Sequence, residues 1–165
     1  MGSQGAVSTG ARQTPGQQKP LGGYAVLALT FNSAVAAAVL LQARSRRSLP
    51  ERIPASDIVL LGLGTFKLSR LISKDRVTAF LRSPFTRQRR AAGESLEEEP
   101  AGGQVSYAVG ELLLCPYCIG MWIGTALLAG YLYNARAART AASVLAVVTV
   151  SDYMQQAWVA VDKTA

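Results

Sequence analysis

LGGYAVLALTFNSAVAAAVLL occupies residues 21–41 and contains no charged side chain. At a rise of 1.5 Å per residue, a helix of this length spans roughly 30 Å, which is the thickness of the hydrocarbon core of a bilayer. A helix pairs its own backbone N–H and C=O groups, so it can cross lipid without leaving them unsatisfied. We therefore predict a transmembrane helix over residues 21–42, with Asn32 facing another helix. A cleaved signal peptide fits less well, because the apolar run is too long and a long tail precedes it.

The composition of the whole chain agrees with a membrane protein. Half of the 165 residues are apolar, 16% are charged, and the mean hydropathy is +0.21. These values exclude a chain that is disordered throughout. Two cysteines and no histidine exclude a disulfide-dense scaffold, a histidine metal site and imidazole catalysis. Residues 1–20 are rich in Gly, Gln, Ser and Thr, and we predict a disordered tail there.

The second apolar segment, residues 57–72, contains Lys67 and Arg70 near its end. It is either a short spanning helix whose basic end reaches the headgroups, or a helix that lies in the interface. We favour the spanning helix.

The third apolar segment, residues 105–133, is divided by Pro116. Proline removes a helical hydrogen bond and kinks a helix, so we predict an interfacial or tilted entry before Cys115 and a span after it. The G-x-x-x-G pattern from Gly120 to Gly124 would let another backbone approach closely. The same pattern is common, so it also occurs without a packing role.

The fourth segment, residues 141–161, begins with an apolar run and then contains Asp152. A carboxylate at mid-depth in a bilayer costs at least ~2.5 kcal/mol, so it normally faces the bundle interior and a partner. If residues 57–72 span, Lys67 lies at nearly the same depth. We therefore predict an intramembrane pair of Asp152 with Lys67 or Arg70, which either fixes the register of the helices or belongs to a proton or ion pathway.

Together the segments predict an all-α integral membrane bundle of about four transmembrane helices. No internal repeat is visible, so an inverted-repeat transporter has no support. A flexible cytoplasmic loop is predicted where the chain is charged, contains Gly and Pro, and lacks periodicity. The predicted units are an extra helix over residues 21–42 and a core over residues 56–162, with helices at about 56–73, 105–134 and 140–162 and the flexible loop at 83–104.

The distribution of lysine and arginine predicts the orientation. With four spans and the N-terminus inside, eleven of the 17 basic residues lie inside and six outside; without the second span, the division is thirteen to four. Both assignments place the C-terminus and the loop after the second segment in the cytoplasm, and the four-span assignment also places the N-terminus there. We expect a multi-pass protein of the bacterial cytoplasmic membrane.

The basic residues around the long loop are interpreted as topology determinants and as contacts to anionic lipid or a protein partner. A nucleic-acid patch is the less favoured interpretation, because the run lies beside a membrane segment. The residues concerned are Lys74, Arg76, Arg82, Arg87, Arg89 and Arg90.

The CPYC sequence from Cys115 to Cys118 leaves three interpretations open. The thiols are reduced and only pack at a helix entry, or they bind zinc, or they do thiol redox chemistry. With no histidine and no third cysteine, zinc would need two copies of the chain or carboxylates such as Glu111 and Asp75. CPYC is also a glutaredoxin-type string, but no βαβ pattern surrounds it. A cytoplasmic pair stays reduced unless it is catalytic.

Several strings in the second half of the chain form a specific combination. They are TFKLSRLI at residues 65–72, KDRVT at 74–78, LRSPF at 81–85, and GELLLCPYC at 110–118 followed by Trp122. This combination resembles the family of domain of unknown function 1360, which comprises small bacterial and phage membrane proteins, over about residues 58–152. The resemblance implies a helical membrane protein whose first shared helix enters at residues 57–72. It favours four helices and makes the first helix an addition. It implies no reaction, and the sporulation label of some members is not transferred.

The function that we expect is that of a non-enzymatic inner-membrane component that binds lipid or protein partners, with a homodimer stapled by zinc at Cys115 and Cys118 as one form. No other cofactor and no nucleic acid are expected. The alternatives are a membrane thiol-disulfide oxidoreductase that uses these cysteines and a small transporter with Asp152 and Lys67 in its path. The sequence has no Ser-His-Asp set, no phosphate-binding Gly loop and no paired catalytic carboxylates, which favours the first class.

Overall fold

The computed structural model describes residues 20–45, 50–90 and 96–163. The predicted tail therefore lies outside the described residues, apart from Pro20. Six helices and one two-stranded sheet are present in the described part of the chain. In chain order they are α1 (Leu21–Arg44), α2 (Ala55–Lys74), α3 (Ala79–Arg82), β1 (Thr86–Arg90), β2 (Leu96–Pro100), α4 (Gln104–Leu114), α5 (Pro116–Tyr133) and α6 (Ala135–Asp162).

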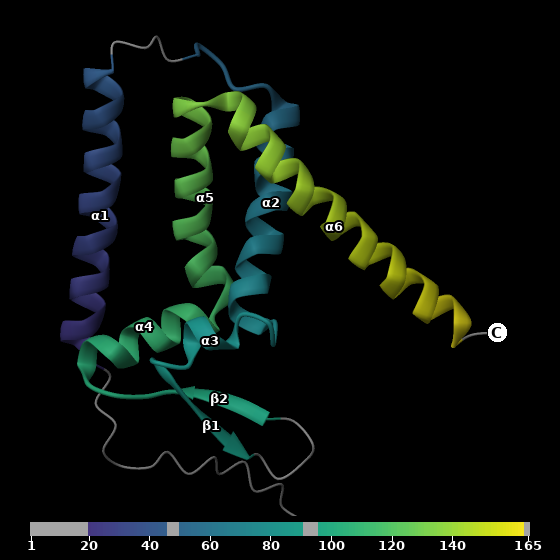
Figure 1. Cartoon of the computed structure of the whole chain (residues 1–165). Helices are drawn as coiled ribbons and strands as arrows, with labels where there is room; N and C mark the ends of the chain where they lie inside the picture. Colours follow the sequence, from purple (N-terminus) through teal and green to yellow (C-terminus); the bar gives the residue numbers. More distant parts are fainter. Residues whose placement is uncertain (1–19, 46–49, 91–95, 164–165) are drawn as a thin grey trace, which may run out of the picture.

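The long helices stand together and the small elements gather at one end of them (Figure 1). Helix α5 stands between α1 and α2, and α6 leaves the upper end of the bundle at an angle. Helix α4 lies across the lower end and meets α5 at 85°. The break falls at Cys115, with Pro116 at the first position of α5, as expected from the helix-breaking effect of proline.

Most of the apolar surface of the long helices is exposed. In α1 only Gly23 is buried, whereas large apolar side chains such as Leu29 and Leu41 are exposed. Contiguous apolar surface of this extent indicates lipid rather than water as the surroundings. Among the described residues, α1 and α6 are long and apolar enough to cross a membrane, and the bent α4–α5 pair adds a third span if it is counted as one. The predicted four spans are thus not established, because α2 does not pass this test.

Small residues let α2 approach its two neighbours closely. Ala138, Ala142 and Ala146 recur every four residues on α6 and are buried. A Cβ atom added at Gly64 of α2 would lie 3.4 Å from Ala142. The core is formed here, where Leu61 of α2 meets this stripe.

The G-x-x-x-G pattern of α5 also faces α2. A Cβ atom added at Gly124 would lie 3.5 Å from Thr65, and one added at Gly120 would lie 3.8 Å from Ser69. The pattern therefore has the packing role that was one of its two interpretations.

The loop predicted as flexible contains a β-hairpin, so the fold is not purely α-helical. Strands β1 and β2 pair antiparallel, with Arg87 opposite Glu99. Opposite charges directly across an antiparallel pair are stabilising. The prediction treated the basic run and the acidic run separately, and their complementarity exists only once the strands pair.

The predicted helix bounds differ mainly at α6, which begins at Ala135 rather than at residue 140. Asn134 explains the earlier start, because its side-chain oxygen accepts a hydrogen bond of 3.2 Å from the backbone N–H of Ala137.

Candidate functional site

The end of α2 is fastened to the hairpin by Arg82. Its guanidinium is buried and donates to the backbone oxygens of Ile72 at 2.6 Å and Asp75 at 3.1 Å. It also donates to both carboxylate oxygens of Glu98 on β2, at 2.8 and 3.0 Å. This bidentate pair lowers the pKa of Glu98 and raises that of Arg82. We call residues 72–82 the elbow.

The predicted lipid or partner contact at Arg82 is therefore wrong. The side chain is buried, and its nitrogens are used by the elbow and by β2. Arginine in a basic run is ambiguous in sequence, because the same residue type serves headgroups and buried carboxylates.

Other basic residues of the set remain exposed beside apolar side chains. Lys74 and Arg76 are exposed, and so are Val77 and Phe80, at 82% and 67%. We call these four residues the rim. Arg87 on β1 is exposed as well. The side chains of Arg89 and Arg90 lie outside the described residues.

Lys67 and Asp152 meet between α2 and α6. The distance from Lys67 Nζ to Asp152 Oδ2 is 2.6 Å, and the two side chains are 16% and 43% exposed. Arg70 instead lies over the ring of Phe66, 5.8 Å from its centroid. The structure thus brings one of the two predicted partners to Asp152; the depth of this pair in a membrane stays a prediction.

A second charged cluster joins three helices at the opposite end from α4. Asp57 of α2 is buried and accepts from the hydroxyl of Tyr131 at 2.6 Å and from Arg139 at 2.6 and 3.0 Å. Sequence reasoning missed this cluster, because it counted Arg139 only as a loop charge. A signal was available in the sequence, because Asp57 lies in the first turn of α2 and Arg139 lies near the start of α6. The fold brings these two helix starts together.

The two cysteines lie at the junction of α4 and α5. Cys115 caps α5: its Sγ accepts from the backbone N–H of Cys118 at 3.3 Å and lies 2.7 Å from Cys118 Sγ. Cys115 is half-buried and Cys118 is exposed. The Glu111 carboxylate, one turn earlier, accepts a hydrogen bond from the hydroxyl of Tyr24 on α1.

The described residues contain no group of three or more Cys, His, Asp or Glu side chains placed to hold a metal ion. A zinc site within one chain, with Glu111 or Asp75 as a further ligand, is therefore not formed among them. A zinc site shared by two copies of the chain stays a prediction.

A hollow of about 450 Å³ opens beside the cysteines, and we call it the dithiol pocket. Its walls come from α1, α4 and β2, and they include Leu27, Pro100, Ala108 and Leu112. The walls are apolar apart from Tyr24, Glu111 and the thiols.

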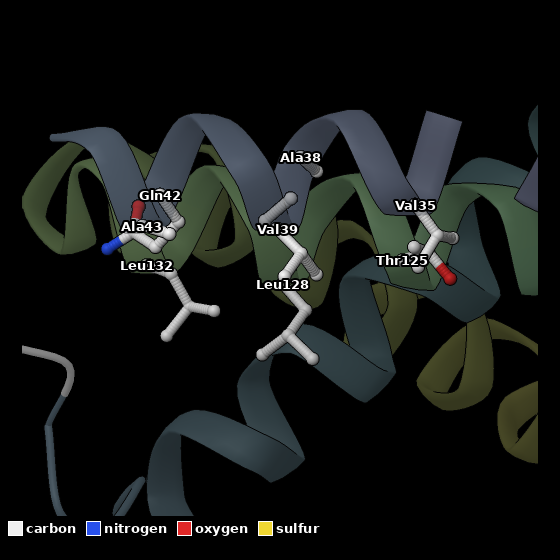
Figure 2. Close-up of a pocket in the computed structure, with 9 residues that line it drawn as sticks. Val35, Ala38, Val39, Gln42, Ala43, Thr125, Leu128 and Leu132 are labelled. Carbon is white, nitrogen blue, oxygen red and sulfur yellow. The ribbon is translucent and has the colours of Figure 1, made fainter. Parts of the chain in front are cut away.

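A separate groove of about 360 Å³ lies between α1 and α5. Figure 2 shows Val39 of α1 and Leu128 and Leu132 of α5 lining it. The side-chain nitrogen of Gln42 is buried at this groove and has no hydrogen-bond partner among the described residues. The groove offers apolar surface, the Gln42 amide and the Thr125 hydroxyl, which donates to the backbone oxygen of Met121 at 2.8 Å; its lining contains no acidic or basic side chain and no cysteine.

Gly110 explains how α4 fits onto the hairpin. A Cβ atom added there would lie 2.5 Å from the backbone oxygen of Phe85 and 3.1 Å from Cβ of Pro100. Only glycine allows this approach, and the N–H of Ala101 closes the base of the hairpin by donating to the same Phe85 oxygen at 2.9 Å.

Two proteins of Bacillus subtilis (strain 168) are similar to the chain. The UPF0713 protein YngL is 26% identical over 107 residues, which cover 65% of this chain and 82% of YngL. The sporulation protein YjcA is 40% identical over 76 residues, which cover 39% of this chain and 58% of YjcA. No solved structure matches the chain.

The family resemblance predicted from the sequence motifs is confirmed. The matching residues include α2 from its second turn, the elbow, the hairpin, α4, α5 and most of α6, and they leave out α1. A family model described as "protein of unknown function (DUF1360)" matches residues 60–158, and the chain belongs to this family.

Proposed function

We propose that the chain is a multi-pass binding component of the bacterial cytoplasmic membrane. Its rim would hold anionic lipid headgroups, and its hairpin would face protein partners in the cytoplasm. The observation that carries the proposal is the rim itself, where exposed Lys74 and Arg76 stand next to exposed Val77 and Phe80. This combination suits the membrane interface, where apolar side chains enter the acyl region and basic ones contact phosphates.

Four spans are the topology that this proposal uses. The charges within α2 are the main objection to a spanning α2, but two of them have partners inside the protein. Asp57 binds Arg139, and Lys67 binds Asp152. Paired charges that face a bundle are the form in which ionisable groups are tolerated in lipid. Helix α4, at 85° to α5, would then lie in the plane of the interface.

The orientation follows from the positive-inside rule. The four-span assignment places eleven basic residues on the side of the elbow and hairpin and six on the other side. Green fluorescent protein fused to either terminus should fluoresce, because it folds in the cytoplasm and not after export through the general secretion pathway. A dark fusion at either terminus, with the protein present in membranes, would contradict four spans.

Lipid binding is tested in nanodiscs of phosphatidylglycerol and of phosphatidylcholine. We expect native mass spectrometry to find phosphatidylglycerol retained by the wild type and lost from the double variant Lys74→Gln, Arg76→Gln. At about 1 kcal/mol per basic residue, affinity should fall by more than about tenfold. The matched control is Arg52→Gln, Arg136→Gln, which removes two exposed charges elsewhere in the chain. Equal retention by both double variants would refute the proposed role of the rim.

A further inference from the structure

We propose that Cys115 and Cys118 are a working dithiol that reduces uncharged, apolar disulfides bound in the dithiol pocket. This activity is carried by residues other than the rim, so the binding role and the dithiol can each fail without the other. Three features of the junction support it: the geometry of the two sulfurs, the position of Cys115 at a helix start, and the apolar hollow next to them.

The two sulfur atoms lie next to each other. They are in contact across the C-x-x-C spacing, which is an arrangement from which an internal disulfide can form. The backbone N–H of Cys118 points at Cys115 Sγ from the first turn of α5. A helix N-terminus stabilises a thiolate, which makes Cys115 the attacking sulfur and Cys118 the resolving one.

The reaction balances without a further oxidant. The Cys115 thiolate attacks one sulfur of the bound disulfide, a mixed disulfide forms, and the other sulfur leaves as a thiolate. Cys118 then gives up its proton and attacks Cys115 Sγ, which releases the second substrate sulfur. Two electrons pass to the substrate, the protons of the two cysteines go to the released thiolates, and Cys115 and Cys118 end as a disulfide. A low-molecular-weight thiol restores the dithiol.

The pocket selects the substrate class. Leu27, Ala108 and Leu112 provide apolar walls, and Glu111 is the acidic group among the lining residues. An anionic substrate would lose its hydration and meet this carboxylate, whereas an uncharged ring would gain contact. Leu27 belongs to α1, outside residues 60–158, so part of the pocket comes from the helix that lies beyond the family match.

The test compares two aromatic disulfides on the reduced, detergent-purified full chain. The measured quantity is the rate with uncharged 4,4′-dithiodipyridine divided by the rate with anionic 5,5′-dithiobis(2-nitrobenzoate). We expect this ratio to be roughly ten times larger for the protein than for free glutathione. The wild type should end with an internal disulfide. Cys118→Ser should stop at the mixed disulfide on Cys115, and Cys115→Ser should lose the fast phase.

Matched variants test the pocket itself. Leu27→Trp should fill the pocket and slow the reaction with dithiodipyridine, while Leu29→Trp, at an exposed position of the same helix, should not. Glu111→Gln should narrow the difference between the two reagents. If both cysteines react independently and no internal disulfide forms, the dithiol activity is refuted. Stoichiometric zinc that is lost in Cys115→Ala would refute it too, because the thiolates would then be metal ligands.

Discussion

Replacing Arg82 with methionine should release the elbow from the hairpin while leaving the helices in place. Methionine keeps much of the length of the side chain but removes the guanidinium. Glu98 then loses its bidentate partner, and the backbone oxygens of Ile72 and Asp75 lose the donor that joins them to β2.

The size of the effect follows from burial. Arg82 is 3% exposed, and the side chain of Glu98 is 18% exposed. Removing one partner of a buried pair costs about 3–5 kcal/mol, because the other charge is left without compensation. Since Glu98 keeps some access to water, we take the lower value of about 3 kcal/mol, which corresponds to local opening increased by about a hundredfold.

Hydrogen–deuterium exchange by mass spectrometry measures this opening. Amides of residues 72–90 and 96–99 that are protected in the wild type should exchange about a hundredfold faster in Arg82→Met, while those in α5 keep the wild-type rate. Arg87→Met is the control, because it removes the same charge from an exposed position on β1. Unchanged protection of residues 72–90 and 96–99 in Arg82→Met would show that the elbow does not depend on this arginine.

Three further outcomes are expected. The pKa of Glu98 is lowered in the folded protein, so its contribution to stability is fully present above the ordinary pKa of about 4 and is lost as the pH falls through the lowered one; exchange from the hairpin, relative to the intrinsic rate at each pH, should therefore rise toward that of Arg82→Met as the pH is lowered. Asp152→Asn leaves Lys67 without its partner, which costs about 2–3 kcal/mol in lipid, and it should lower the melting temperature measured in detergent. Asp152→Glu should keep most of the wild-type stability, because it restores a carboxylate. Gly124→Leu should push α5 from Thr65 and lower the melting temperature more than the same change at Gly130, where a Cβ atom meets nothing within 4 Å.

The sequence predicted those features that depend on one segment at a time. An uncharged run long enough to cross lipid indicated α1, and Pro116 indicated the break before α5. The meeting of Lys67 and Asp152 was predicted from depth alone, since two charges in lipid must find each other. The choice of Lys67 over Arg70 was not predictable, because it depends on the rotation of α2 about its axis.

Other features that depend on two distant segments, apart from the Lys67–Asp152 pair, were missed. The hairpin requires basic Arg87 to lie opposite acidic Glu99, which no local period reveals. The burial of Arg82 depends on the return of the chain through β2. In the sequence alone, Arg82 cannot be told from an arginine that contacts a lipid headgroup. The cysteine pair was singled out from its motif, but the pocket beside it was not, because one wall of the pocket comes from α1.

Several of the strings that carried the family resemblance surround the end of α2, and three charged pairs show how this helix is held. Asp57 fixes its start to α6, Lys67 fixes its middle to the same helix, and Arg82 fixes its end to β2. These three pairs set the height and rotation of α2, and small residues of α5 and α6 then pack against it. The buried Arg82, which follows the end of α2, therefore attaches this helix to its neighbour β2. Lys74 and Arg76 of the rim are exposed near this end of α2, as is Cys118 of the junction, and none of them takes part in these three pairs, so they are available for the binding and the chemistry that we propose.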